Sequence, residues 1–283
     1  MTELPKCSIV QTVGCAGDGW GSTLRSTGRW ARGLLLVALL AALAGTACAS
    51  EDGDEIVVSA ASSLTDAFTE LAEAFEREHD ATISLNFGSS SSLAVQLVEG
   101  APAHVFASAN RQQMDVVVEA GLTEDPAVLA RNEIVVVTPA DLGLIEGFED
   151  LASDGVRLVL AGPDVPVGAY ARQAIDAANE AMGGAFEGRV LANVVSEEAN
   201  VRAVLTKVEL GEVDAGIVYA TDAAVAGDAV EAYRVPTEFA PPAEYFIAAL
   251  ADSPDAAQEF VEFVLSEEGQ AILERHGFTP AGG

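Results

Sequence analysis

The stretch EIVVSAASSLTDAFTELAEAF, residues 55–75, places a strand, a turn and a helix in succession. Its first part, Glu55–Ala60, is a short β-branched run typical of a buried strand. From Leu64 onward the apolar residues recur at i, i+3, i+4 and i+7, which is the stripe of a helix packed on a sheet. Ser62 and Ser63 lie between the two. The stretch therefore predicts a strand that leads through a hydroxyl-rich turn into a helix.

The same alternation of short apolar runs and amphipathic helices continues to the end of the chain. The expected strands are Glu55–Ala60, Thr82–Phe87, Val105–Ala109, Ile134–Thr138, Arg157–Ala161, Val190–Val195, Ala215–Tyr219 and Tyr245–Leu250. Strands that alternate with helices indicate largely parallel sheets covered on both faces, an α/β fold. The roughly 230 residues from Glu55 onward suit two small α/β domains better than one open sheet.

Residues 1–49 are interpreted as an export leader. An apolar run over 33–44 is followed by the small residues GTACAS, and it is preceded by three basic residues, Arg25, Arg29 and Arg32. This order is typical of a secretory signal, and the run is shorter than the ~20 residues of a transmembrane helix. We therefore expect an exported protein, either periplasmic or lipid-anchored on the outer face of the cytoplasmic membrane.

The end of the leader leaves two alternatives for processing. Cleavage could follow Ala49, or it could precede Cys48 and leave a lipid on that cysteine, the one membrane attachment that we expect. Residues 50–54 would then form a short tether. The other cysteines, Cys7 and Cys15, also lie in the leader, so the exported part is expected to form no disulfide.

The formal net charge of −30 excludes several partner classes. Nucleic-acid binding requires basic patches that release counterions, and an anionic membrane surface would repel this chain for the same reason. The leader holds four of the 14 basic residues and only two of the 44 acidic ones, so the exported part is more acidic still. A solvated, soluble surface accounts for such a charge.

Five junctions between expected elements carry hydroxyl groups or helix starts. They contain Ser62 and Ser63, the serines 89–92, Pro166, Asn200 with Val201, and Tyr219. Ligands of open α/β sheets bind at the carboxyl ends of strands, and a helix start offers unpaired N–H groups and a positive dipole end. Together these junctions could supply roughly seven neutral donors to a tetrahedral dianion. Arg202 is the one basic residue beside them.

Two other interpretations compete with an anion site. Each serine taken alone is also explained as a helix N-cap, which contributes about 1 kcal/mol. A secreted serine hydrolase using Ser63 or Ser90 would need an activating base, and neither Ser-x-x-Lys nor Gly-x-Ser-x-Gly occurs in the sequence. The histidines have no metal-ligand spacing. We expect no enzymatic activity, no cofactor and no bare metal ion.

The motifs taken together resemble a known family. They are AASSLTDAF (60–68), FGSSSSLAVQLVEGAPA (87–103), VPVGAYARQA (165–174), ANVRAVL (199–205), GIVYATDA (216–223) and RHGFTP (275–280). In this order and spacing they resemble the molybdate-binding proteins of molybdate ABC transporters. The resemblance spans about residues 55–280.

The resemblance implies a class II periplasmic-binding-protein fold. Two α/β domains joined by two crossover segments would close on molybdate or tungstate in the cleft between them. Residues 55–135 and 234–283 would form domain 1, and residues 136–233 would form domain 2. The protein would be a monomeric receptor that delivers its ion to a membrane permease.

The resemblance also assigns the ion ligands. Serine ligands fall on Ser63 and Ser90, backbone N–H donors on Val167 and Val201, and a tyrosine ligand on Tyr219. Two departures stand out: His104 replaces the usual Asp after GAPA, and Ser62 beside Ser63 leaves the register of the first ligand open by one. Sulfate, phosphate or another oxyanion remains an alternative guest, although a receptor for phosphate would be expected to offer an acceptor carboxylate.

Overall fold

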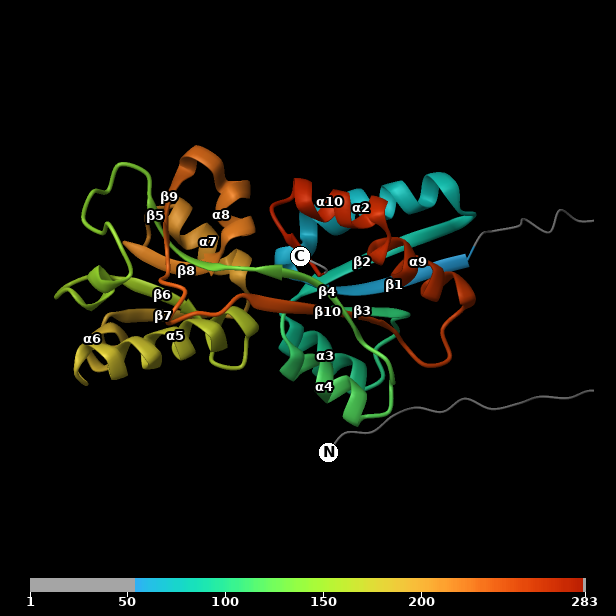
Figure 1. Cartoon of the computed structure of the whole chain (residues 1–283), viewed down its shortest axis with the longest axis horizontal. Helices are drawn as coiled ribbons and strands as arrows, with labels where there is room; N and C mark the ends of the chain where they lie inside the picture. Colours follow the sequence, from blue (N-terminus) through green and yellow to red (C-terminus); the bar gives the residue numbers. More distant parts are fainter. Residues whose placement is uncertain (1–53, 282–283) are drawn as a thin grey trace, which may run out of the picture. The chain divides into compact units, whose positions relative to one another are not determined.

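The computed structural model describes residues 54–281, which belong to one compact unit (Figure 1). The expected leader 1–49, the lipidation candidate Cys48 and nearly all of the tether 50–54 lie outside the described residues. The described chain is a mixture of helices and strands arranged in two sheets, which confirms the α/β prediction.

The first sheet has six strands in the order β11-β4-β10-β3-β1-β2. Its strands are β1 (Asp54–Ala61), β2 (Ala81–Gly88), β3 (Val105–Ser108), β4 (Ala127–Asn132), β10 (Ala243–Ala249) and β11 (Thr279–Pro280). Its helices are η1 (Ser62–Leu64), α2 (Thr65–Glu78), α3 (Ser90–Val98), α4 (Arg111–Glu119), α9 (Asp255–Leu265) and α10 (Glu267–Arg275). Helices α2, α9 and α10 cover one face, and α3 and α4 cover the other (Figure 1).

The second sheet has five strands in the order β7-β6-β8-β5-β9. Its strands are β5 (Ile134–Pro139), β6 (Leu158–Ala161), β7 (Val194–Glu198), β8 (Ala215–Tyr219) and β9 (Val230–Arg234). Its helices are η2 (Glu149–Ala152), α5 (Pro166–Met182), α6 (Phe186–Ala192), α7 (Val201–Glu209), α8 (Ala220–Ala226) and η3 (Gly227–Ala229). The chain enters this sheet between β4 and β5 and leaves it between β9 and β10.

Strand direction differs from the sequence-based expectation of largely parallel sheets. Strand β1 is parallel to β2 and β3, and β6 is parallel to β7 and β8. Strands β10 and β5, however, run antiparallel to both of their neighbours. Both are the first strands after the chain has passed from one sheet to the other, so no local strand–helix–strand crossover fixes their direction.

The expected strand Val190–Val195 is wrong over its first four residues. Phe186 and Val190 are buried on one face of α6, at the i, i+4 spacing of a helix, and the strand begins only at Val194. Strands β4, β9 and β11 were not expected. The other seven expected strands are present, with ends that differ by no more than two residues.

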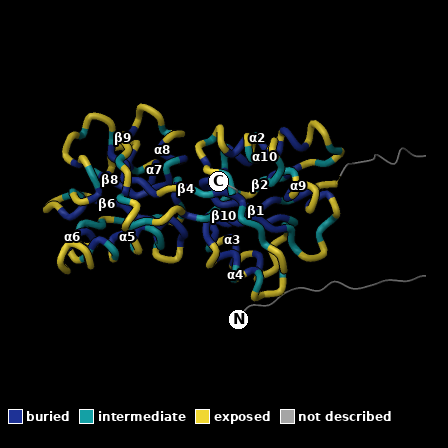
Figure 2. Tube along the Cα trace, viewed as in Figure 1, coloured by how far each residue is buried: buried dark blue, intermediate teal, exposed yellow. Residues whose placement is uncertain are grey.

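The apolar cores follow the strands and the inward helix faces (Figure 2). Phe68, Leu71 and Phe75 of α2 are fully buried, and Phe75 meets Phe260 edge to face with ring centres 5.3 Å apart. This packing fixes α2 against the first sheet and therefore fixes the turn that precedes it.

Candidate functional site: a cavity of neutral donors

The predicted ligand residues all line one small cavity. Its lining residues are Ala61, Ser62, Ser63, Gly88, Ser89, Ser90, Ala109, Val165, Pro166, Val167, Val201 and Tyr219. All five residues assigned from the resemblance are in this set, and they come from elements of both sheets. The cavity volume is about 10 Å³, near the minimum that holds one water molecule.

Ser90 lies at the start of α3 but does not cap it. The cap is Ser89, whose hydroxyl accepts a hydrogen bond from the N–H of Ser92 at 3.2 Å. Ser90 Oγ instead accepts from the N–H of Ala109 at 3.0 Å. A backbone N–H can only donate, so the hydroxyl hydrogen of Ser90 is left to donate elsewhere.

Ser63 is not a cap either. It lies in the short helix η1, and neither η1 nor α2 has a side-chain cap at its start. Its Oγ lies 2.9 Å from the hydroxyl of Tyr245 on β10. The capping explanation therefore does not describe the contacts of Ser63 and Ser90.

Two helix starts contribute backbone N–H groups. Pro166 is the first residue of α5, so the amide of Val167 lies in its first turn, beyond reach of the helix's own carbonyls. Asn200 caps α7: its side-chain oxygen accepts a hydrogen bond from the N–H of Ala203 at 3.0 Å. Val201 is the first residue of α7, and its N–H is not the one that this cap satisfies. Both amides lie at the positive end of a helix dipole, a position that favours an anion.

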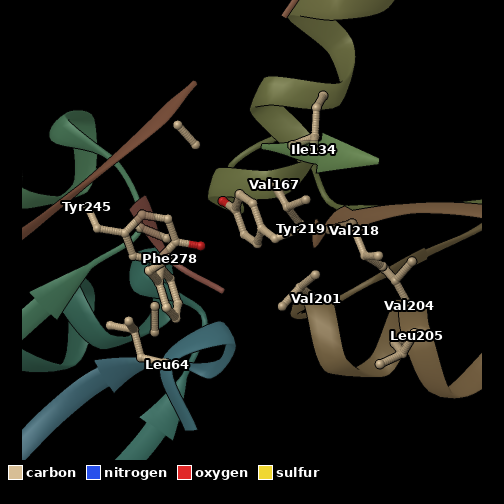
Figure 3. Packing of buried hydrophobic residues seen from close by; sticks show 14 of the residues in the cluster. Leu64, Ile134, Val167, Val201, Val204, Leu205, Val218, Tyr219, Tyr245 and Phe278 are labelled. Atoms are coloured by element: carbon tan, nitrogen blue, oxygen red, sulfur yellow. The ribbon is translucent and has the colours of Figure 1, made fainter. Parts of the chain in front are cut away.

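Tyr219 ends β8 with its side chain fully buried. Its hydroxyl makes no hydrogen bond of good geometry within the described chain, although the Tyr245 hydroxyl lies close enough to affect its pKa. Burial raises the pKa of Tyr219 well above its usual value, so the hydroxyl keeps its proton and can donate it. Figure 3 shows this hydroxyl directed toward Tyr245, with Val167 and Val201 on either side of the Tyr219 ring.

Arg202, which follows the lining residue Val201, is paired with two carboxylates. Arg202 Nη2 lies 2.5 Å from Asp66, and Arg202 Nε lies 2.7 Å from Asp222. Burial raises the pKa of Asp222 to about 7, although the charge of Arg202 opposes that rise. Among the described residues, no charged side chain lines the cavity.

His104 replaces the aspartate expected from the resemblance, and the structure shows how it holds the turn. Its Nδ1 accepts a hydrogen bond from the backbone N–H of Val57 at 2.9 Å. The backbone N–H of His104 in turn donates to the carbonyl of Val57 at 2.7 Å. The ring nitrogen thus acts as an acceptor beside β1.

Sequence reasoning missed Ala109 and Tyr245. Ala109 was placed at the end of an expected strand, but its bond to Ser90 needs two distant segments to meet. Tyr245 was one apolar residue among several in an expected strand, and no local pattern distinguishes it. Ser62, the alternative to Ser63 as the first serine ligand, also lines the cavity.

A cavity of uncharged donors at helix starts, with no acid or base among the described residues that line it, fits a solute-binding site. The chain belongs to the family of bacterial extracellular solute-binding proteins, whose model matches residues 56–279. Members of this family bind solutes rather than transform them, so the protein is not an enzyme. Within residues 54–281 no helix is long and apolar enough to cross a membrane.

Relatives and solved structures agree with this class. The chain is 38% identical over 229 residues to the molybdate-binding protein ModA of Mycobacterium tuberculosis, covering 79% of this chain and 84% of that one. It matches the periplasmic molybdate-binding protein of Azotobacter vinelandii with a TM-score of 0.69 at 21% identity, over 79% and 98% of the two chains. It matches the sulfate-binding protein SubI of M. tuberculosis with a TM-score of 0.72 at 18% identity, over 81% and 87%. At these two identities the structures show the fold alone.

Proposed function

We propose that this receptor binds molybdate, and tungstate with it, through Ser63, Ser90, Val167, Val201 and Tyr219. The observation that carries the proposal is that all five residues line one small cavity with no charged residue in its described wall. The 38% identity to a molybdate-binding protein supports the choice of ion.

The site would hold a dianion by oriented dipoles. The hydroxyls of Ser63, Ser90 and Tyr219 and the amides of Val167 and Val201 are all donors, and each carries no charge. Donors fixed within each folded element need little local reorganisation once the domains have closed on the ion, and a closed wall selects by size. Tungstate has the same charge and shape as molybdate, whereas sulfate is smaller and would leave some donors at longer distances.

Delivery to a membrane permease of an ABC importer completes the proposal. The two sheets would act as two domains, residues 55–135 with 234–283 and residues 136–233, that close on the ion. A receptor that presents the closed form to the permease would release the ion there. Lipidation of Cys48 would keep the receptor at the membrane, and labelling with radioactive lipid of wild type and Cys48→Ser would test that step.

Titration calorimetry of the purified protein with molybdate, tungstate and sulfate tests the choice of ion. We expect molybdate and tungstate to bind much more tightly than sulfate. In thermal denaturation, molybdate at one hundred times its Kd should add about 2.7 kcal/mol to the free energy of unfolding. An equal response to sulfate would overturn the selectivity, and no response to any oxyanion would overturn the function.

A further inference from the structure

Tyr245 lies behind the cavity wall and touches one of its donors. It is fully buried on β10, and its hydroxyl lies 2.9 Å from Ser63 Oγ, which is also buried. Tyr245 is not among the residues that line the cavity, so it acts on a guest only through wall residues: Ser63, to which it is hydrogen-bonded, and Tyr219, whose ring packs against its own.

An anion fixes the direction of this hydrogen bond. A fully deprotonated oxyanion has no hydrogen to donate, so Ser63 must donate its single hydroxyl hydrogen to the guest. Ser63 Oγ can then only accept from Tyr245, whose O–H is the donor. A hydroxyl that accepts one hydrogen bond donates a stronger one, because the two bonds polarise each other.

The surroundings of Tyr245 favour its role as a donor. Burial raises the pKa of Tyr245 well above its usual value, so its proton stays in place. Asn132 Oδ1 accepts from the N–H of Glu133 at 2.9 Å, while Asn132 Nδ2 donates to Thr221 Oγ1 at 2.9 Å. Ser63, Asn132 and Tyr219 all lower the pKa of Tyr245 and so oppose the effect of burial, which means that the direction of the bond to Ser63 follows from the guest's lack of a hydrogen and not from these neighbours.

Ser90 shows the same arrangement with a different partner. Its oxygen receives the N–H of Ala109, which leaves its own hydrogen for the cavity. With Tyr245 as the donor, both serines receive one hydrogen bond from the fold and offer one to the cavity. For Ser90 the backbone fixes that direction, whereas for Ser63 it depends on a single side chain, Tyr245.

We propose that Tyr245 is a positioning residue that donates to Ser63 Oγ and thereby turns the Ser63 hydroxyl hydrogen into the cavity. The wall then presents donors only, and it accepts a fully deprotonated oxyanion while disfavouring one that carries a proton. This inference rests on the proposed function, because it assumes that Ser63 contacts the guest.

Tyr245→Phe tests the proposal with little change of packing. The ring keeps its edge-to-face contacts with Tyr219 and Phe278, whose centres lie 5.5 and 5.4 Å away. We expect molybdate to bind about threefold to tenfold more weakly, the effect of one hydrogen bond. The ratio of molybdate to hydrogenphosphate affinity should also fall, because the freed Ser63 hydroxyl can rotate and accept.

A double-mutant cycle separates positioning from a structural role. In a Ser63→Ala background, Tyr245→Phe should cause no further loss of affinity. The matched control is Tyr233→Phe, which removes the hydroxyl of a surface tyrosine bonded to Glu231 and should leave affinity unchanged. Unchanged affinity in Tyr245→Phe, or an equal loss in both backgrounds, would overturn the proposal.

A measurement on the wild type covers the case in which Tyr245→Phe does not fold. The buried hydroxyl proton of Tyr245 should move downfield in the proton NMR spectrum when molybdate is added, and it should not move in Ser63→Ala. No movement in the wild type would overturn the proposal. If the wild type bound sulfate and not molybdate, the choice of ion would fail, and the same cycle with sulfate would decide the role of Tyr245.

Discussion

Arg202 in the first turn of α7 forms an ion pair with Asp66 in the first turn of α2. Helix α2 packs on the first sheet and α7 on the second, so the pair joins the two sheets beside the cavity. The same guanidinium contacts the buried Asp222. The Arg202 side chain therefore links elements of the two sheets and is not part of the described cavity wall.

Asp66→Asn should weaken molybdate binding without touching the ion. The ligand residues come from both sheets, so a contact that joins the sheets pre-organises the cavity. Both side chains are partly exposed, and the expected loss is therefore small, about 0.5–1 kcal/mol of binding free energy. Calorimetry at low and high salt measures it, and the difference from wild type should shrink at high salt. Asp115→Asn, which removes a surface pair with Arg111 on α4, is the control and should bind like the wild type.

Asp222→Asn should change how stability depends on pH. Burial raises the folded-state pKa of Asp222 to about 7, above its usual value of 3.8. The folded state therefore holds a proton that the unfolded state has lost between these two values, so this residue lowers stability as pH rises from about 4 to 7. Asparagine has no such titration. Relative to wild type, the variant should gain about 2 kcal/mol of unfolding free energy between pH 5 and pH 8 in urea denaturation. A difference that stays constant with pH would refute the assignment.

Gly168→Ala should destabilise the protein and weaken ion binding together. A Cβ at this position would lie 2.1 Å from the carbonyl oxygen of Gly162 and 2.5 Å from that of Ala161. The start of α5 would have to move, and the amide of Val167 would move with it. We expect a loss of about 1–3 kcal/mol in urea denaturation. Gly188→Ala on α6 is the matched control, since nothing lies within 4 Å of its Cβ, and it should be neutral or stabilising.

The sequence was sufficient for those parts of the site that depend on local pattern. Strand runs and helix stripes predicted the five junctions, and the family resemblance assigned one residue in each. These residues are Ser63, Ser90, Val167, Val201 and Tyr219, and the structure brings all five to one cavity. Strand β8 has the expected bounds, because its apolar run is buried along its whole length. The division into two domains stays a prediction, as does the role of the five residues as ion ligands.

The remaining features depend on contacts between distant segments. The short strands β4, β9 and β11 have weak patterns of their own, and each pairs with a strand from another part of the chain. The bond between Tyr245 and Ser63 spans 182 positions, and the pair of Arg202 with Asp66 spans 136. No periodicity within a window of neighbouring residues contains such information.

Ser63→Ala and Ser90→Ala should each weaken molybdate binding by about 1–3 kcal/mol, since each removes one donor. Ser90→Ala should also lower stability, because it takes the acceptor from the buried N–H of Ala109. Calorimetry and urea denaturation separate the two effects. Ser266→Ala is the control: Ser266 caps α10, so its loss should lower stability by about 1 kcal/mol and leave affinity intact. If both serine variants bind molybdate like the wild type, these hydroxyls do not contact the ion.

Tyr219→Phe should separate binding from stability most clearly. The Tyr219 hydroxyl is buried and has no hydrogen-bond partner in the described chain, so without an ion it imposes the cost of an unsatisfied polar group. Removing it should leave the ion-free protein as stable as the wild type or slightly more stable. The same change should weaken molybdate binding about tenfold, because it removes the hydrogen bond that the hydroxyl donates to the bound ion. Thermal denaturation with and without molybdate measures both quantities. A variant that loses stability without the ion, and loses no additional stability with it, would show that Tyr219 supports the fold and does not bind the guest.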